Sequence, residues 1–301
     1  MIAQPTDSIP QTIDPFESLV AGPSAVLPFV GPRDFIQTYG LRENPFADCV
    51  HPAFFFRTDC HANAVRCMKL AVELNTSLGL VTGPSGTGKT LVTQLLLTHF
   101  PEPKYEVALV LVTPGLSKTG ILREILAELD IALPAGIARV QDLVKTLSNF
   151  IIELHQQGRR LVLVFDEAHL LSSDCLHIIR TITNIEIPEQ KLASCLLFGE
   201  SRLWERMQHA TYEALRNRIY LRSELGPLTC AETAQYIKFR LMNAGHLADL
   251  FTDSALEVLH LVSGGIPRTL NKVAMLSLIG GAEAHAEVID DMIVLNAAKR
   301  L

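Results

Sequence analysis

Short apolar runs alternate with longer amphipathic segments from residue 77 onward, and this alternation predicts a parallel β-sheet covered by helices. The runs with the composition of buried strands are Leu78–Thr82, Val107–Thr113, Leu161–Phe165, Ala193–Phe198 and Ile219–Leu221. The segments with helical periodicity between them are Thr90–His99, Lys118–Leu129, Val140–Gln157, Cys175–Ile185 and Arg202–His209. We therefore expect a three-layer αβα domain with a five-stranded parallel sheet.

After Pro227 the strand-like runs stop and only amphipathic helices are predicted. These helices are Cys230–Ala244, Asp253–Ser263, Pro267–Ala282 and Glu287–Lys299. Gly264 is suited to end one of them, and Pro267 is suited to the first turn of the next. The expected organisation is an α/β domain over residues 34–226, followed by a small all-α domain over residues 227–301.

Residues 1–33 carry six prolines and no sustained periodicity, which predicts a flexible tail or linker. Its short apolar groups, Phe16–Leu19 and Val26–Phe29, leave docking onto the body or a partner as the alternative.

Composition narrows the class of protein. The chain is 48% hydrophobic with a net charge of −6, which excludes extensive disorder and argues against avid nucleic-acid binding by the whole surface. No apolar run approaches the ~20 residues of a membrane span, and the N-terminus lacks a secretory signal. The cysteines form no C-x-x-C pair, so we expect free thiols rather than a zinc site. A cytoplasmic protein without stable membrane insertion is expected.

The strongest motif is a glycine-rich loop, Gly83-Pro84-Ser85-Gly86-Thr87-Gly88-Lys89-Thr90, placed between a predicted strand and a predicted helix. Its backbone N–H groups and the helix N-terminus are expected to hold the phosphates of a nucleoside triphosphate, with Leu91 completing the nucleotide contacts. Lys89 should reach the β- and γ-phosphates, and the Thr90 hydroxyl should ligate Mg²⁺.

An acidic pair, Asp166 and Glu167, ends the strand Leu161–Phe165. Asp166 is expected near the Mg²⁺ ion, and Glu167 is expected to orient or deprotonate a water beside the γ-phosphate. Together with Ala168 and His169 the pair spells the DEAH box of one helicase class. That class needs a second motor domain, which the helical region after Ile219 does not offer, so His169 is interpreted as a residue that starts a helix.

These motifs resemble those of the AAA+ ATPases, and within them the secretion-pathway protein A (ExeA-like) type and the related TniB and TnsC transposition ATPases. The segment from Phe35 to Phe46 is similar to the opening of that branch, and His61 with Ala64 to its next helix. The resemblance implies an ATP site in which this opening, Phe46 included, lines the adenine pocket.

The resemblance also implies three arginine roles. Leu215-Arg216-Asn217-Arg218-Ile219 is similar to the element whose arginine reaches the nucleotide of a neighbouring subunit, so Arg218, with Arg216 as the reserve, is the expected finger. Gly264-Gly265-Ile266-Pro267-Arg268 is similar to the second sensor, which would bring Arg268 from the helical lid toward the γ-phosphate. A ring or filament of identical subunits formed with ATP is implied.

Two residues differ from those that are usual at the same positions in this branch of the ATPases. Glu200 stands where a glutamine is usual, and a carboxylate near phosphate is repelled unless it is protonated, paired or turned away. Glu200 is therefore an open candidate for the first sensor, and slow hydrolysis is an associated expectation. Thr113 stands where relatives often have asparagine, and either holds Glu167 or merely ends its strand.

Three functions are compatible with these motifs. One is an ATPase that assembles a secretion or pilus-type machine, as in the shorter members of the branch, which pass their output to protein partners. Another is a transposition regulator that recruits a transposase on duplex DNA, with Lys118, Arg123, Arg159 and Arg160 as candidate phosphate contacts. The third is a nucleotide switch with little hydrolysis.

Overall fold

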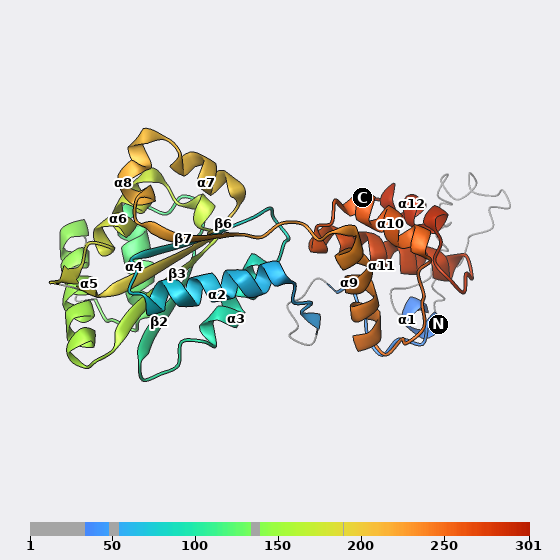
Figure 1. Cartoon of the computed structure of the whole chain (residues 1–301), viewed down its shortest axis with the longest axis horizontal. Coiled ribbons are helices and arrows are strands. Elements are labelled where there is room, and N and C mark those ends of the chain that lie inside the picture. Colours follow the sequence, from blue (N-terminus) through green and yellow to red (C-terminus); the bar gives the residue numbers. More distant parts are fainter. Residues whose placement is uncertain (1–33, 48–53, 134–138, 189) are drawn as a thin grey trace, which may run out of the picture.

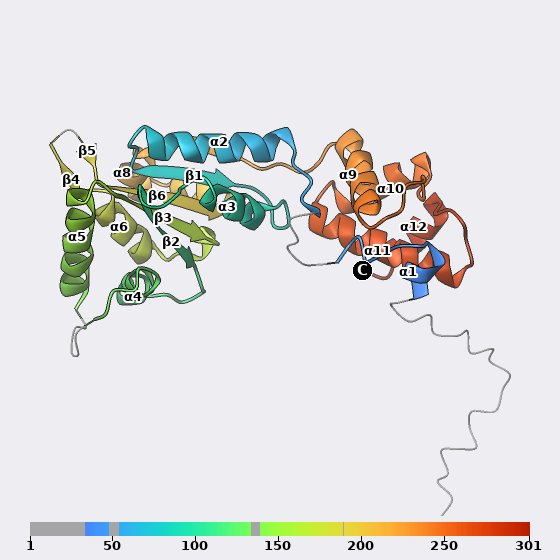
Figure 2. The same cartoon turned by 90° about the horizontal axis from the view of Figure 1, so that it is seen from below.

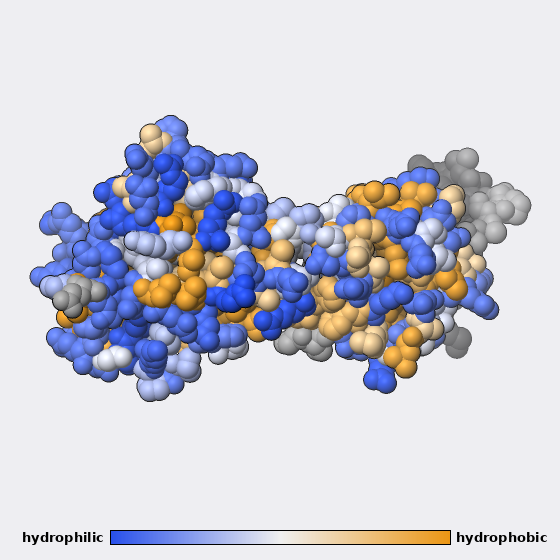
Figure 3. All heavy atoms as spheres, viewed as in Figure 1, coloured by the Kyte–Doolittle hydropathy of each residue, from blue (hydrophilic) through white to orange (hydrophobic). Residues whose placement is uncertain are grey.

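The structure is a computed structural model that describes residues 34–47, 54–133, 139–188 and 190–301. The predicted tail over residues 1–33, with its apolar groups Phe16–Leu19 and Val26–Phe29, lies outside the described residues. The molecule has two lobes joined by a narrower waist, one built on a sheet and one of helices alone (Figures 1 and 3).

A parallel five-stranded sheet forms the centre of the first lobe, as the alternating pattern predicts. Its strands are β1 (Leu78–Thr82), β2 (Tyr105–Leu111), β3 (Arg160–Asp166), β6 (Ala193–Gly199) and β7 (Ile219–Glu224). Their spatial order is β2-β3-β6-β1-β7, so β3 and β1 both neighbour β6. The carboxyl ends of these three central strands therefore meet at one edge of the sheet.

Helices cover both faces of the sheet, which confirms the three-layer prediction. One face of β3, with Leu161, Leu163 and Phe165, packs against the helices α4 to α8. The other face, with Val162 and Val164, packs against α2 and α3. The bounds are α2 (Asp59–Glu73), α3 (Lys89–Leu97), α4 (Lys118–Glu128), α5 (Val140–Gln156), α6 (Ser173–Ile182), α7 (Ser201–Met207) and α8 (Glu213–Arg216).

Short elements fill the connections between these helices and strands. They are the 3₁₀ turns η2 (Ala168–Leu170) and η3 (Ala210–Tyr212) and the antiparallel pair β4 (Glu186–Ile187) and β5 (Gln190–Lys191).

The second lobe is all helical, as expected for the region after Pro227. It contains α9 (Cys230–Asn243), α10 (Asp253–Ser263), α11 (Pro267–Glu283) and α12 (Asp291–Ala298). Gly264 ends α10 with a φ of 59°, and Pro267 occupies the first turn of α11, both as predicted. The last helix starts four residues later than its pattern predicts, because Asp290 caps it through a bond from the Ile293 N–H.

The expected boundary at residue 34 needs a correction. Helix α1 (Asp34–Thr38) and the residues after it pack into the helical lobe, where α1 lies beside α11 (Figure 2). Phe35, Tyr39, Leu41 and Phe46 all belong to the same buried cluster as the lid helices. These four residues do not pack on the sheet, because α2 and α3 already cover the face of the sheet that carries Val162 and Val164. The helical lobe therefore has two parts, one from each end of the described chain.

Candidate functional site

The glycine-rich loop joins β1 to α3 at the carboxyl edge of the sheet. Gly86 and Gly88 adopt φ values of 81° and 95°, a left-handed region that other residues rarely enter. Gly86 also has no room for a side chain, because an added Cβ would lie 2.7 Å from the Cβ of Arg268. Helix α3 begins directly after this turn at Lys89, so its free N–H groups face the loop.

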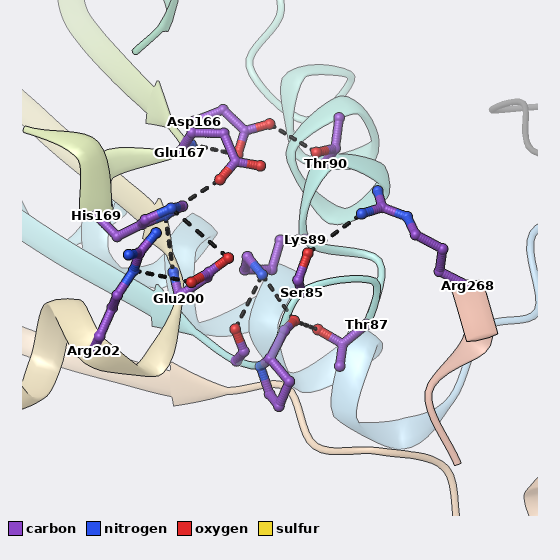
Figure 4. A network of polar contacts seen from close by, with 12 residues as sticks. Ser85, Thr87, Lys89, Thr90, Asp166, Glu167, His169, Glu200, Arg202 and Arg268 are labelled. Carbon is purple, nitrogen blue, oxygen red and sulfur yellow. Dashed lines mark hydrogen bonds and ion pairs between the residues drawn. The ribbon is translucent and has the colours of Figure 1, made fainter. Parts of the chain in front are cut away.

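Lys89 lies inside the loop. Its Nζ donates to the carbonyl oxygens of Gly83 at 3.0 Å and Pro84 at 2.9 Å (Figure 4). Burial lowers the pKa of the Lys89 ammonium, and the nearby Glu167 carboxylate is the largest influence that opposes this. A phosphate group in the loop would supply the counter-charge that the carbonyl oxygens supply only in part.

The acidic pair lies next to the loop because β3 is separated from β1 only by β6. Thr90 Oγ1 donates to Asp166 Oδ2 at 2.9 Å, and the Glu167 N–H donates to Asp166 Oδ1 at 2.8 Å. A hydroxyl and a carboxylate held together are oxygen donors of the kind that Mg²⁺ takes alongside phosphate and water. These two side chains therefore fit the predicted metal role.

Glu167 follows β3 with a φ of 55°, and its side chain is 39% exposed toward the cavity described below. Its carboxylate lies 3.2 Å from Nδ1 of His169, whose ring is buried in η2. His169 is interpreted from the sequence as a residue that starts a helix; it lies instead in the middle of the short 3₁₀ turn, which begins at Ala168, and its ring contacts the site. Thr113 is exposed beyond the end of β2, and no bond joins it to Glu167 among the described residues.

Glu200 caps α7 after β6, and its carboxylate is paired. Its Oε2 lies 2.9 Å from Nε of Arg202, and its Oε1 lies 3.8 Å from Nε2 of His169 (Figure 4). The repulsion expected between Glu200 and a phosphate is therefore offset by a neighbouring guanidinium.

A cavity of about 400 Å³ lies between the loop and the helical lobe. Its lining includes the loop residues Ser85, Gly86, Thr87, Gly88, Lys89, Thr90 and Leu91, together with Glu167 and Arg268. Gly83 and Pro84 contribute to the same site through the carbonyl oxygens that bind Lys89. The structure thus brings most of the predicted nucleotide contacts to one place.

Aromatic side chains form another part of the lining of this cavity, which we call the aromatic wall. It consists of Phe54, Phe55, Phe56 and Tyr236, and Arg240 lies over the ring of Phe54 at 4.8 Å. Such faces suit a flat base. The run of three phenylalanines before α2 is the sequence signal from which this wall could be predicted. Phe46 was expected here, but it is 1% exposed in the core of the helical lobe and does not line the cavity.

His61 connects α2 to the loop. Its Nε2 lies 2.9 Å from the Thr87 carbonyl oxygen, and its Nδ1 lies 2.6 Å from Thr58 Oγ1. Burial lowers the pKa of His61, so the ring is neutral at pH 7 and can serve as donor to one of these oxygens and acceptor from the other.

Three predicted arginines have different positions. Arg268, at the start of α11, donates to Ser85 Oγ at 3.3 Å and so reaches the loop. Arg218 donates to the Ala214 carbonyl and to Asn184 Oδ1, and Arg216 donates to two carbonyls at the end of α7. Neither Arg216 nor Arg218 lines the cavity of its own chain.

The candidate DNA contacts do not form one group. Lys118 starts α4 on the carboxyl side of β2 and pairs with Asp174, and Arg123 lies on the same helix. Arg159 and Arg160 lie at the opposite edge, where β3 begins. There they line a second cavity of about 330 Å³ together with Lys104 and His155.

Comparison with known proteins finds a family model, a sequence relative and solved structures that this chain resembles. Residues 73–207 match the model of the AAA domain. General secretion pathway protein A of Aeromonas hydrophila is 32% identical over 247 residues, which are 81% of this chain and 44% of that protein. The chain thus spans less than half the length of this relative.

Solved structures share the fold at low identity. Cdc6p from Pyrobaculum aerophilum is 16% identical with a TM-score of 0.66, over 85% of this chain and 70% of that one. The Aeropyrum pernix ORC2 protein, solved as ADPNP-ADP complexes, is also 16% identical with a TM-score of 0.61, over 85% and 71%. In the part of the chain that the structure describes, no helix has the length and apolar character needed to cross a membrane.

Proposed function

Because this chain contains a domain of the AAA family and is related to general secretion pathway protein A, we propose that it binds and hydrolyses ATP in the cavity between its two lobes. The observation that carries the proposal is the contact of Thr90 with Asp166 beside the loop that encloses Lys89. This arrangement supports the binding of a phosphate group with a metal ion beside it.

Each group has a role in this proposal. The loop N–H groups and Lys89 hold the phosphates, and Lys89 exchanges its carbonyl partners for phosphate oxygens. Thr90 and Asp166 would hold a Mg²⁺ ion, which offsets the charge on the phosphate oxygens. Glu167 accepts a proton from the attacking water, and Arg268 contacts the phosphates from the helical lobe. The aromatic wall receives the adenine.

Hydrolysis is proposed to need a second subunit. Arg216 ends α8, and Arg218 directly precedes β7. Neither residue lines the cavity of its own chain. An arginine supplied by a neighbour would stabilise the charge of the transition state. ATP would therefore favour a homo-oligomer, a ring or a filament, and ADP would loosen it.

The relationship to a secretion protein supports an assembly role in the cytoplasm, where ATP-driven association acts on the protein partners of a secretion or pilus-type machine. The alternative is regulation on duplex DNA. It is favoured by the second cavity, whose lining includes the cationic side chains of Lys104, Arg159 and Arg160. Such side chains are common partners of backbone phosphates.

Replacement of Glu167 by glutamine tests the central proposal. The variant should bind ATP as the wild type does, lose turnover, and accumulate as an ATP-bound oligomer in size-exclusion chromatography. The loss expected is about 10²–10⁴-fold, the range for a general base. Turnover at the wild-type rate would show that Glu167 is not the base.

Duplex-DNA binding by fluorescence anisotropy at fixed, near-physiological salt separates the two pathways, because phosphate contacts depend strongly on salt. Tight binding with ATP that weakens with ADP would support the DNA alternative. The absence of binding in both states would favour assembly of a protein machine. Arg160→Gln is the matched variant, since it removes charge from the second cavity.

A further inference from the structure

The ring of His169 lies between two carboxylates at the ends of adjacent strands. Glu167 follows β3, Glu200 follows β6, and these two strands pair along the sheet. Nδ1 of His169 is 3.2 Å from Glu167 Oε2, and Nε2 is 3.8 Å from Glu200 Oε1. The ring itself is buried, with its side chain 4% exposed.

Nδ1 has two neighbours and can satisfy one of them at a time. Besides the Glu167 carboxylate, the backbone N–H of Glu200 points at this nitrogen from 3.3 Å. A protonated Nδ1 donates to Glu167, whereas an unprotonated Nδ1 accepts from the Glu200 N–H and repels the carboxylate. The neutral ring therefore has two states, which differ in the nitrogen that carries the proton.

The surroundings keep the ring neutral. Burial is the largest influence and lowers the pKa of His169, and the cations of Arg202 and Lys89 act in the same direction. The carboxylates of Glu200 and Glu167 oppose this shift, but the net direction is downward. At pH 7 the ring is therefore uncharged in both states, and the states differ only in whether Nδ1 or Nε2 carries the proton.

Glu167 has no other side-chain partner within hydrogen-bond or ion-pair distance in the described part of the chain. The far side of the ring faces Glu200, which Arg202 fixes at 2.9 Å. The neutral imidazole carries one proton, so it can donate to only one of these two carboxylates at a time.

We propose that His169 is a positioning residue that holds the Glu167 carboxylate through Nδ1–H and couples its orientation to Glu200. This inference rests on the proposed role of Glu167 as the base. The coupling to Glu200 runs through its backbone N–H, which competes with Glu167 for Nδ1 and bonds to it when the proton is on Nε2.

Three substitutions of His169 test the proposal by steady-state ATP hydrolysis. His169→Phe keeps the ring shape without a donor, and should lower kcat by about 10–100-fold, the usual cost of losing an orienting partner, with little change in KM. His169→Asn places an amide N–H near the position of Nδ1 and should recover most of kcat. His169→Gln reaches the position of Nε2 and should recover little.

Other kinetic results would overturn the proposal. These are an unchanged or increased kcat in His169→Phe, a rise in KM alone, or better recovery with glutamine than with asparagine. Absence of turnover in the wild type would instead refute the proposed function, and a second measurement then decides the role of His169 without any need for activity.

That measurement is the tautomer of His169 by ¹⁵N NMR of the full chain labelled at histidine, with His169→Asn used to assign the signals. The wild type should carry the proton on Nδ1. In Glu167→Ala the acceptor is gone, so Nδ1 should accept from the Glu200 N–H and the proton should move to Nε2. A proton on Nε2 in the wild type, or one that stays on Nδ1 in the variant, would refute the contact.

Discussion

Replacement of Phe35 by alanine should destabilise the helical lobe, although Phe35 is almost two hundred residues away in the sequence from α9, the first of the C-terminal helices of that lobe. The Phe35 side chain is 1% exposed within the buried cluster that includes Leu270 and Val273 of α11. Truncation of a buried phenylalanine to alanine costs about 3–5 kcal/mol, because it removes apolar contacts and leaves a cavity. That loss is a large fraction of a typical stability of about 5–15 kcal/mol.

The assay can separate the two lobes. Trp204 is the one tryptophan of the chain and lies on α7, so its fluorescence reports unfolding of the α/β lobe. Far-UV circular dichroism reports the helices of both lobes. In urea, Phe35→Ala should lower the free energy of unfolding measured by dichroism by about 3–5 kcal/mol, with a smaller change in the Trp204 transition.

Gln37→Ala is the matched control, since Gln37 is exposed on the same helix and its replacement should change stability by at most about 0.5 kcal/mol. A loss below about 1 kcal/mol in Phe35→Ala would refute the packing of α1 against α11, because such a value is typical of a residue outside the core. A shift confined to the Trp204 transition would assign the segment to the α/β lobe.

Three further outcomes are expected. Lys89→Ala should weaken ATP binding at least ~10-fold, since a charged hydrogen bond contributes about 1.5–3 kcal/mol, whereas Gln94→Ala on the exposed side of α3 should bind normally in the same fluorescence titration. Arg218→Ala should retain ATP affinity and lose about 10³-fold or more in turnover, and loss of binding would indicate a structural arginine instead. Burial lowers the pKa of His61, so the unfolded chain binds more protons near pH 6 and the free energy of unfolding should rise from pH 5 to about pH 7. His61→Gln should reduce that slope in urea titrations, and an unchanged slope would contradict the assignment.

The periodic elements could be predicted because their signals are local. Runs such as Leu161–Phe165 are buried on both faces, and such strands are apolar throughout. The phosphate loop could be predicted because its spacing alone places Lys89 and Thr90 at the start of a helix. The position of Asp166 beside this loop could be predicted because the carboxyl ends of parallel strands lie at one edge of the sheet.

Three features could not be predicted because they depend on which surfaces meet. The pattern around Phe35 indicates a buried residue, but it does not indicate which lobe buries it. The same limit explains the misplacement of Phe46, which shares that core. The contact of His169 with Glu200 joins residues 31 positions apart, and it depends on the pairing of β3 with β6.

The position of Arg268 links the phosphate loop to the helical lobe. Its backbone N–H donates to the Gly86 carbonyl at 3.3 Å, and its guanidinium donates to Ser85 Oγ at the same distance. The start of α11 therefore rests on the loop that would receive the phosphates, and Gly86 leaves no space between them. In the proposed function the phosphates bind beside this contact, so the position of α11 would depend on the bound nucleotide. Since α1 packs against α11 in one core, α1 would move with α11, and in the proposed homo-oligomer a neighbouring subunit would contact a helical lobe whose position depends on the nucleotide.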